Sequence, residues 1–570
     1  MSRRAAEALR CLALALAVLA VFARAYGFLS GQRLDAPLTT SGDAMGTAAL
    51  LRAVSEGDFV PFASKHVSRL AAPAVANWDD FAIPEELLYF LWGTLARVTG
   101  VFAAMNLGLA TASVGAALSL YAVARRLGAR WEWAWAAGAL YGLTPYLFAR
   151  NVSHFQLSFF WHLPWNVLVS AWLASRRGVP LGSRRFAAAA GIVAVTALLN
   201  PYYLFFCAQL HALAVLGRWA RQRHVDWKTP LALGLTAALC FLSVNRDTLA
   251  ARWTRGPNPH AVERDPTDVE THAFKPSLLV APSNQTHRWK AMRILGGTFQ
   301  RQALTTSEFP SGYVGLVGAA ALLAVLLAFL VGLARSRLDF TARTGAAALW
   351  LMGSAGVGGL GSALAAAGFL FLRSTNRVSV LILALALLGA ARLAGRLTRR
   401  WPWLLSAALA LGLSAFGVYE QTPPRVADVA VLASNEELFE GNALGEALER
   451  EFPPGSALFQ LPAMEFPEVP PVNGVDVYEQ FRPYVFTRTL RFSYGGMKGR
   501  PEADFQREAA RLEPAALVPA LQAKGFSGVY LDQRCCSAEA VAHFTEGMDA
   551  AGARLVLRTP KRTVWRLPSP

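Results

Sequence analysis

Long apolar runs recur along the chain, and they limit its fold more than any other feature of the sequence. Only a helix of about 20 residues crosses the hydrocarbon core of a bilayer, because a helix satisfies its own backbone hydrogen bonds there. Apolar residues make up 54% of the 570 residues, and charged residues only 16%. This composition excludes an intrinsically disordered chain, and five cysteines in 570 residues exclude a disulfide-rich scaffold. The sequence therefore predicts an α-helical polytopic membrane protein.

The apolar runs predict about eleven membrane-spanning helices. Asn200-Pro201 and a glycine-rich stretch at 353–361 interrupt the pattern, so the spans beside them are the least regular. The first run also resembles a signal peptide, because Arg3 and Arg4 precede it, and that alternative stays open. The predicted spans are residues 9–28, 101–124, 131–149, 155–175, 186–200, 202–217, 229–246, 312–334, 344–369, 377–395 and 401–418.

Basic residues exceed acidic residues by 17, and this excess predicts the orientation of the chain in the membrane. Almost all of it falls in short loops on one side of the predicted topology. Because cytoplasmic loops are enriched in Lys and Arg, we expect these loops and the N-terminus in the cytoplasm. An excess explained in this way leaves no support for a nucleic-acid partner. The clusters are Arg3/Arg4/Arg10, Arg125/Arg126/Arg130, Arg176/Arg177/Arg184/Arg185, Arg218/Arg221/Arg223/Lys228, Arg335/Arg337/Arg343 and Arg392/Arg396/Arg399/Arg400.

Long segments are then expected on the extracytoplasmic side, chiefly a first outer loop at about 29–100 and the tail. We divide the chain into a multi-span membrane domain at 1–418 and an extracytoplasmic domain at 419–570. Strands and helices alternate in the tail, which favours an α/β fold. Cys535 and Cys536 are adjacent in the tail, and adjacent cysteines rarely bridge to each other, so we do not expect a bond between them. The predicted tail strands are 456–461, 528–531, 554–558 and 563–567, and the predicted helices are 503–523 and 537–551.

The first outer loop carries acidic residues that could take part in chemistry. Asp43 follows the first span by about a dozen residues and precedes a short amphipathic helix at 46–55. A general base, a metal ligand and the N-cap of that helix are all open as roles for Asp43. Asp79 and Asp80 are either metal ligands or part of a solvated turn.

Polar residues at the mouths of other predicted spans are further candidates, because polar groups at that depth are costly without a partner. Asn151 and His154 lie in a short second outer loop, where His154 either faces a cavity or is satisfied by a neighbouring carbonyl. Tyr202 and Tyr203 lie in a tight turn between two spans, where tyrosine is also common as an interfacial anchor.

Basic residues on the outer side suggest an anionic ligand. His287 and Arg288 could hold a phosphate, or they could lie in a solvated loop. Arg373 and Arg377 stand at an outer mouth, against the trend of the other basic residues. Either an anionic ligand or snorkelling to the interface explains this position. Glu308 leads into the span that follows it.

The arrangement resembles the GT-C superfamily of membrane glycosyltransferases, and within it the bacterial YfhO-like multi-span proteins. The shared features are an acidic residue soon after the first span, many further spans and an outer C-terminal domain. The residues that carry the resemblance are 42–44, 121–128, 154–157, 200–203, Glu308 with 313–315, 373–377 and 490–500.

The resemblance implies an enzyme that moves a sugar from a polyprenyl-phosphate carrier to an envelope glycan, lipid or protein acceptor. It implies a bacterial inner (plasma) membrane, with transfer and the C-terminal domain on the extracytoplasmic side. Asp43 would be the catalytic carboxylate, acting as general base or holding a divalent cation such as Mg or Mn. Asp79 and Asp80 are further metal candidates. The implied substrate-binding residues are His154, Asn151, Tyr202, Tyr203, His287, Arg288, Glu308, Arg373 and Arg377.

Metal dependence and function both stay open at this point. Many enzymes of the superfamily have a second acidic residue in the second outer loop, where this chain has Asn151 and His154. A non-catalytic membrane assembly factor and a lipid-linked glycan transporter or flippase are the alternatives to the enzyme. The sequence contains no P-loop, no dinucleotide-binding fingerprint, no HExxH motif and no GxSxG motif, so ATP-driven transport by this chain is not expected.

Overall fold

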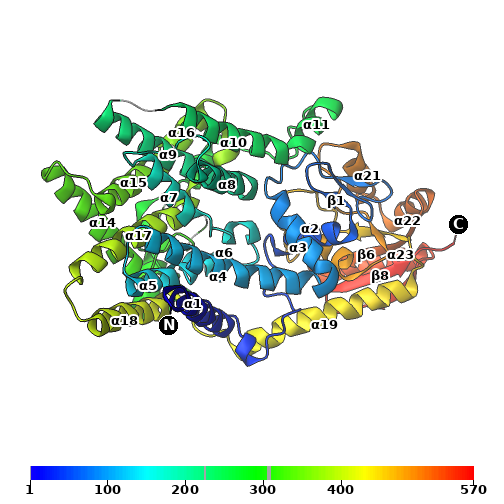
Figure 1. The fold of residues 1–570 in the computed structure, drawn as a ribbon. Helices are drawn as coiled ribbons and strands as arrows, with labels where there is room; N and C mark the ends of the chain where they lie inside the picture. The colour runs from blue at the N-terminus through cyan, green and yellow to red at the C-terminus, as the bar shows by residue number, and fades with distance from the viewer. Residues whose placement is uncertain (1, 224–225, 304–307, 309, 570) are drawn as a thin grey trace.

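Helices build most of the molecule, and they end in a smaller unit that contains a β-sheet. The computed structural model describes residues 2–223, 226–303, 308 and 310–569. The helical region lies at one end of the molecule and the C-terminal unit at the other, with the long helix α19 (Asp428–Glu451) running along one side of the latter (Figure 1). This arrangement confirms the predicted fold class of a multi-pass helical protein with a C-terminal α/β region.

Several helices have the length and hydropathy of membrane spans. Within the described residues five helices meet this requirement alone, and a sixth span results if the bent pair α10 and α11, which meet at 57°, is taken as one. These are α1 (Arg3–Ala25), α4 (Val101–Arg126), α14 (Leu316–Ala334), α17 (Ser379–Leu397) and α18 (Trp403–Gln421), with the pair α10 (Lys228–Val244) and α11 (Arg246–Arg255).

The other five predicted spans form shorter or less apolar helices. In the described chain, length and hydropathy therefore support fewer spans than the predicted eleven. Pro145 ends the continuity of the predicted span 131–149, because proline has no N–H to donate within a helix. Gly356 likewise ends the first helix of the predicted span 344–369. The helices are α5 (Trp131–Gly142), α6 (Pro145–Arg150), α7 (Leu163–Leu173), α8 (Arg184–Leu199), α9 (Pro201–Gln222), α15 (Phe340–Ala355) and α16 (Leu360–Ala366).

The centre of the helical region is formed by α4 and α17, whose apolar windows are 61% and 72% buried. Small residues allow α5 to approach α4 closely, as is common between membrane helices. A Cβ atom at Gly138 would stand 2.8 Å from the Ala117 carbonyl oxygen, and one at Gly142 would stand 2.7 Å from the Ser113 carbonyl oxygen. Helix α1 is also packed into this region, where its Leu14 is fully buried.

The C-terminal unit is built on a five-stranded mixed sheet with the order β5-β4-β6-β8-β7. Strand β4 is parallel to both β5 and β6, whereas β8 is antiparallel to β6 and β7. The predicted helix 503–523 is divided in two, because Pro514 begins a new helix. The strands are β4 (Ala457–Leu461), β5 (Arg491–Phe492), β6 (Phe526–Asp532), β7 (Arg554–Arg558) and β8 (Arg562–Arg566), and the helices include α20 (Arg482–Phe486), α21 (Pro501–Ala509), α22 (Pro514–Ala523) and α23 (Ala538–Ala550).

The first outer loop packs against this unit. It contains α2 (Ala44–Glu56), α3 (Glu86–Thr99) and an antiparallel sheet of β1 (Phe59–Val60), β2 (Ser64–Val67) and β3 (Ala76–Asn77). The Ala71 N–H donates to the Tyr494 carbonyl at 2.9 Å, and the Phe492 N–H donates to the Arg69 carbonyl at 2.8 Å. The indole of the fully buried Trp78 donates to the Gly495 carbonyl at 2.8 Å. Two segments far apart in the sequence therefore share one core.

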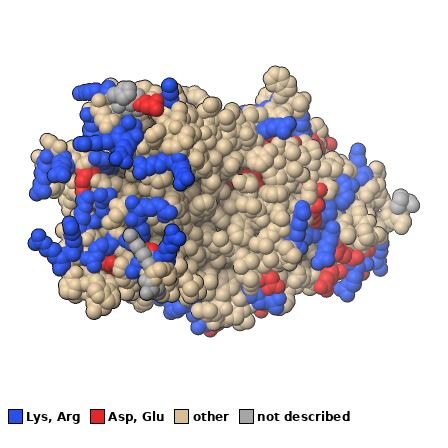
Figure 2. Space-filling view, in the orientation of Figure 1, with Lys and Arg blue, Asp and Glu red and all other residues tan. Residues whose placement is uncertain are grey.

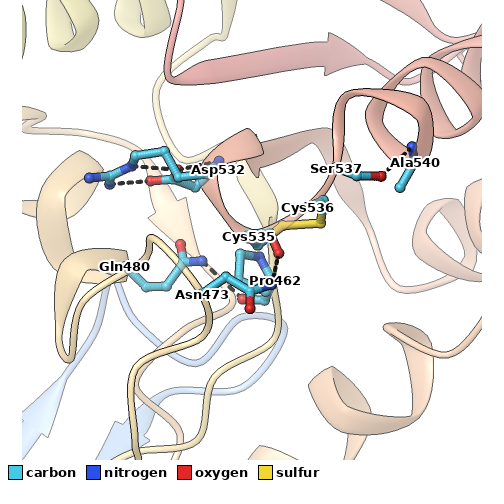
Figure 3. The surroundings of a disulfide bond; sticks show 9 residues. Pro462, Asn473, Gln480, Asp532, Cys535, Cys536, Ser537 and Ala540 are labelled. Atoms are coloured by element: carbon cyan, nitrogen blue, oxygen red, sulfur yellow. Dashed lines mark hydrogen bonds and ion pairs between the residues drawn. A yellow bond between two sulfur atoms is a disulfide. The ribbon is translucent and has the colours of Figure 1, made fainter.

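The structure joins Cys535 and Cys536 in a disulfide, so the expectation that they stay unbonded is wrong. The short helix η7 (Gln533–Cys535) ends at this bond, and Ser537 caps the following helix α23 by accepting a hydrogen bond from the Ala540 N–H at 3.2 Å (Figure 3). The amide of Asn473 donates to the Cys535 carbonyl and fixes the turn from a second loop. Adjacent elements therefore hold both cysteines in the bonded arrangement.

Charged residues are distributed unevenly over the surface. Figure 2 shows Lys and Arg gathered on the end of the helical region that lies away from the C-terminal unit. A broad band almost free of charged side chains separates this end from the C-terminal unit, where basic and acidic residues are mixed (Figure 2). The basic end matches the loops that the sequence analysis grouped on one side.

Candidate active site

Asp43 lies beside a small cavity between the first outer loop and the C-terminal unit. It occupies the N-cap position of α2 as predicted, but its side chain makes no capping hydrogen bond. The cavity has a volume of about 90 Å³. Helices α2 and α3 contribute Thr47 and Tyr89, the second outer loop contributes Gln156, and the C-terminal unit contributes Tyr478. Further lining residues are Gly46, Leu50, Trp78, Phe81, Phe466 and Phe481.

The environment of Asp43 favours its protonated form. Burial raises the pKa of the carboxyl to about 6, and the negative charge of Glu468 acts in the same direction. The positive charges of Arg377 and Arg373 oppose this shift. In the part of the chain that the structure describes, the Asp43 carboxylate has no hydrogen-bond partner. A carboxylate with a pKa near neutrality and a free lone pair is suited to accept a proton.

Glu308 lies between two buried arginines close to this cavity. Its carboxylate receives Arg150 Nη2 at 2.7 Å and Arg377 Nη2 at 3.1 Å. The Arg150 side chain is 2% exposed, and those of Glu308 and Arg377 are each 13% exposed. Burial alone would raise the pKa of Glu308, but the two guanidinium groups hold it well below its ordinary value. The cluster therefore carries one net positive charge. Within it, the charge of Arg377 lowers the pKa of Asp43, and the charge of Glu308 raises it.

The two candidate tyrosines belong to the surroundings of this cluster. Arg377 lies over the ring of Tyr202 at 4.3 Å from its centroid, and Arg150 lies over the ring of Tyr146 at 5.2 Å. The Tyr203 hydroxyl donates to the Leu157 carbonyl at 2.8 Å, so it accepts from the Tyr146 hydroxyl at 3.0 Å. Tyr202 thus stabilises the charge of Arg377. Tyr203 holds the end of the second outer loop through its hydrogen bond to Leu157.

Asn151 and His154 lie in the second outer loop, which Ser153 joins to the segment before Asp43. The Asn151 side chain accepts the Ser153 N–H at 2.8 Å, and the Ser153 hydroxyl donates to the Ser41 carbonyl at 3.2 Å. Burial and the charge of Arg150 lower the pKa of His154 to about 3, so its imidazole is neutral at physiological pH. In the described residues the Nδ1 atom of His154 is buried without a hydrogen-bond partner.

Arg373 is a cation for which the described part of the chain provides no partner. Its side chain is half-buried, and no hydrogen bond or ion pair to it occurs within the described ranges. Its charge lowers the pKa of both Asp43 and Glu468, so it lies near the two carboxylates. A guanidinium in this position is free to bind an anion.

His287 and Arg288 form hydrogen bonds near the end of α18, away from the Asp43 cavity. His287 Nδ1 accepts the Trp289 N–H at 3.1 Å, so Nε2 donates to the Glu420 carboxylate at 2.9 Å. Arg288 donates to the Pro423 carbonyl at 3.1 Å. Both side chains therefore brace the end of α18, and among the described residues neither contacts the cluster of Arg150, Glu308 and Arg377.

Asp79 and Asp80 are also engaged away from Asp43. Asp79 accepts the Lys65 N–H at 2.7 Å and pairs with His66 at 3.2 Å. Asp80 receives Arg500 through two hydrogen bonds of 2.6 and 2.9 Å, with its side chain 2% exposed. Neither lies in a solvated turn. Within the described ranges no three His, Cys, Asp or Glu side chains are grouped as a metal site would require.

Glu85 is a buried carboxyl group that the sequence analysis missed. It lies at the start of α3, is 8% exposed and accepts the Asn200 amide at 2.9 Å. Burial raises its pKa to about 7, and the charge of Arg377 acts against this shift. The Asn200-Pro201 step was read as a turn, although an amide at the mouth of a span also signals a buried polar partner.

Comparisons with known proteins agree with this architecture. No protein-family model and no curated protein sequence matches the chain. The fold is similar to that of ArnT, a membrane protein of the GT-C type. One similar solved structure is ArnT from Cupriavidus metallidurans bound to undecaprenyl phosphate, with a TM-score of 0.51 and 13% identity over 100% of this chain and 99% of that one. An oligosaccharyltransferase from Archaeoglobus fulgidus, crystallised with Zn and sulfate, has a TM-score of 0.43 and 12% identity over 97% of this chain and 73% of its own. The more specific likeness to YfhO-like proteins stays a prediction.

Proposed function

We propose that this protein is a glycosyltransferase that moves a sugar from a polyprenyl-phosphate carrier to an acceptor in the bacterial cell envelope. The observation that carries the proposal is Asp43, a carboxylate that burial makes basic and that lacks a hydrogen-bond partner in the described chain. It lines a cavity, and the positive charges of Arg373 and Arg377 lie close enough to lower its pKa. The fold shared with ArnT, which was crystallised with undecaprenyl phosphate, supports a lipid-phosphate donor.

In the proposed reaction Asp43 accepts the proton of the acceptor hydroxyl. The hydroxyl oxygen forms a bond to the anomeric carbon of the sugar while the bond from that carbon to the phosphate oxygen breaks. The electron pair of the broken bond stays on the phosphate. Arg373, with the net positive charge of the Glu308 cluster behind it, stabilises this developing charge. His154 is neutral and supplies a hydrogen bond instead of a charge.

An apolar cavity of about 490 Å³ is suited to the isoprenoid chain of the carrier. Helix α3 forms one wall with Leu88, Leu91 and Trp92, and Leu91 is 57% exposed at the surface. The adjacent Tyr89 of the same helix lines the Asp43 cavity. A single helix thus separates the proposed lipid site from the proposed reaction centre, which supports delivery of the carrier phosphate to Arg373.

We propose that transfer takes place outside the cytoplasm. The basic end of the helical region and the positive-inside rule favour a cytoplasmic N-terminus and an extracytoplasmic C-terminal unit (Figure 2). The Cys535–Cys536 disulfide is consistent with an oxidising compartment. No step is assigned to a divalent cation, because the described residues beside Asp43 do not form a metal-binding group.

Sugar transfer by purified protein in lipid tests the proposal. A panel of polyprenyl-phosphate sugars is offered together with an envelope-glycan extract. We expect Asp43→Asn to lower transfer by about 10²–10⁴-fold, the range for loss of a general base. Asp35→Asn is the matched control, because Asp35 lies in the same loop with its side chain 47% exposed. Equal transfer by wild type and Asp43→Asn would refute the proposed role of Asp43, and no transfer by wild type would favour a non-catalytic assembly factor.

A further inference from the structure

A second cavity, of about 560 Å³, lies in the C-terminal unit at the carboxyl ends of β4 and β6. These strands are parallel neighbours, so their last residues, which include Leu461 and Leu531, meet at one edge of the sheet. The crevice at the carboxyl ends of parallel strands is the usual ligand site of open α/β sheets. The volume lies within the range of cavities that bind small ligands. This cavity shares no lining residue with that of Asp43.

One wall of the cavity is the turn that contains the disulfide. Pro462, Cys535, Cys536 and Ala540 all line the cavity, and Figure 3 shows them close together where η7 meets α23. Gln480 donates to the Pro462 carbonyl at 2.9 Å. This bond and the one from Asn473 to Cys535 fix both sides of the wall. The disulfide therefore presents a rigid, weakly polar surface to whatever occupies the cavity.

Gln506 of α21 is a polar side chain in the cavity whose amide nitrogen is unpaired in the described chain. It lines the cavity and is 5% exposed. Its side-chain Nε2 has no hydrogen-bond partner within the described residues. A buried amide without a partner is unfavourable, and a ligand oxygen that accepts from it would remove that cost. The same cavity is lined by Glu465, Arg507, Glu513 and His543, which can donate or accept hydrogen bonds.

The combination of groups suits a sugar ring. A sugar ring offers apolar C–H faces, which pack on surfaces such as the disulfide, Val541 and Phe544. Its hydroxyls both donate and accept, so they match an amide, carboxylates and a guanidinium at the same time. A purely apolar ligand would leave Gln506 unpaired, and a phosphate would meet the carboxylates of Glu465 and Glu513.

We infer that this cavity binds a glycan chain and holds it as the acceptor of the transferase. Neighbouring residues of one segment line the two cavities. Pro462 and Glu465 line the cavity of Gln506, and the next residue, Phe466, lines the cavity of Asp43. Only the acceptor role rests on the proposed function. Binding of a glycan does not depend on whether Asp43 is catalytic.

Binding of the full-length protein in detergent to an array of neutral and acidic bacterial-envelope glycans tests the inference. We expect wild type to bind at least one glycan, and Gln506→Leu to weaken that binding about tenfold, as for loss of one hydrogen bond in a buried site. Because leucine removes an unpaired amide at similar volume, Gln506→Leu should unfold at the same temperature as wild type or a higher one. Glu508→Gln is the control, since Glu508 is exposed on the same helix and does not line the cavity.

The outcomes separate this site from the reaction centre. Retained glycan binding in Asp43→Asn, together with loss in Gln506→Leu, supports a separate glycan site whether or not transfer is detected. Binding that Gln506→Leu leaves unchanged, or the absence of binding by wild type to every glycan of the array, overturns the inference. Loss of binding in Asp43→Asn but not in Gln506→Leu would assign the glycan to the Asp43 cavity instead.

Discussion

Asp43 and the other acidic candidates of the first outer loop differ in what surrounds them. Asp79 and Asp80 are satisfied by Lys65 and Arg500, whereas Asp43 has no such partner in the described chain. The sequence predicted Asp43 as a candidate from its place after the first span. Partners for Asp79 and Asp80 come from residues up to 420 positions away, so sequence spacing could not distinguish these three carboxylates.

The pH dependence of transfer follows from the pKa of Asp43. Its folded-state pKa of about 6 lies above the ordinary value of 3.8, so the base is lost as pH falls through 6. We expect the rate to level off above pH 7 and to fall to about one tenth of that level at pH 5. Because burial destabilises the ionised form, Asp43→Asn should unfold at neutral pH at a temperature no lower than wild type. A rate independent of pH between 5 and 7 would contradict this role for Asp43.

Glu308 should be important for stability as well as for the site. Glu308→Gln leaves Arg150 and Arg377 buried without a counter-charge, which costs about 3–5 kcal/mol for a buried pair. We expect a clear fall in the unfolding temperature in detergent. The control Glu263→Gln changes a side chain that is 67% exposed and should have no effect. An equal, small effect of both variants would show that the cluster does not stabilise the fold.

At the scale of elements, the apolar runs predicted the positions of the helices more accurately than their lengths. Hydropathy does not reveal that Pro145 divides the run 131–149, whereas the break between α8 and α9 at Asn200 agrees with the predicted spans 186–200 and 202–217. The alternation of strands and helices in the tail was sufficient to predict the α/β sheet. Its contact with the first outer loop was not predicted, because backbone bonds such as that between Ala71 and Tyr494 leave no local pattern.

Arg69 is the residue that most directly joins the first outer loop to the C-terminal unit. Its buried guanidinium donates to the carbonyls of Tyr484, Thr487 and Leu490 at 3.0–3.1 Å and pairs with Glu56 at 2.8 Å. Glu56 would keep its ion pair with Arg52 at 2.8 Å. We therefore expect Arg69→Ala to lower stability by about 1–3 kcal/mol for each buried carbonyl left without a donor.

Amide hydrogen exchange can measure this loss of stability in the two segments that Arg69 joins. In Arg69→Ala, exchange should accelerate at 69–72 and 490–495, where backbone hydrogen bonds join the two segments. Arg33→Ala is the control, since Arg33 is 48% exposed, and its contacts with Asp35 and the Phe439 ring lie outside these two segments. Unchanged protection in Arg69→Ala would mean that the two segments are held together by other contacts.

At the scale of the whole molecule, the sequence predicted the class of fold from hydropathy and charge alone. The basic loops lie far apart in the sequence, and they gather at one end of the folded chain (Figure 2). The hydropathy and charge of each segment depend only on its own residues. They can therefore be read from the sequence without knowledge of the folded structure. The Gln506 cavity was not predicted as a site, because it combines segments that meet only in the folded molecule. Glu308 and Arg377 were predicted as site residues, but their pairing with Arg150 was not.

Cysteine labelling in intact cells tests the proposed orientation. We expect a membrane-impermeant maleimide added outside to label Glu508→Cys, because Glu508 is exposed on the C-terminal unit. Arg177→Cys, in an exposed basic loop, should react only after the membrane is opened. Labelling of Arg177→Cys but not of Glu508→Cys in intact cells would reverse the orientation.

The most direct test of the central claim is a single-turnover experiment with purified protein, bound polyprenyl-phosphate sugar and an acceptor glycan. Mass spectrometry follows free polyprenyl phosphate and the extended glycan together. We expect the two products to appear in equal amounts and at the same rate in wild type, and both to be lost in Asp43→Asn. A carrier that stays intact in wild type while acceptor and carrier are both bound would contradict a glycosyltransferase.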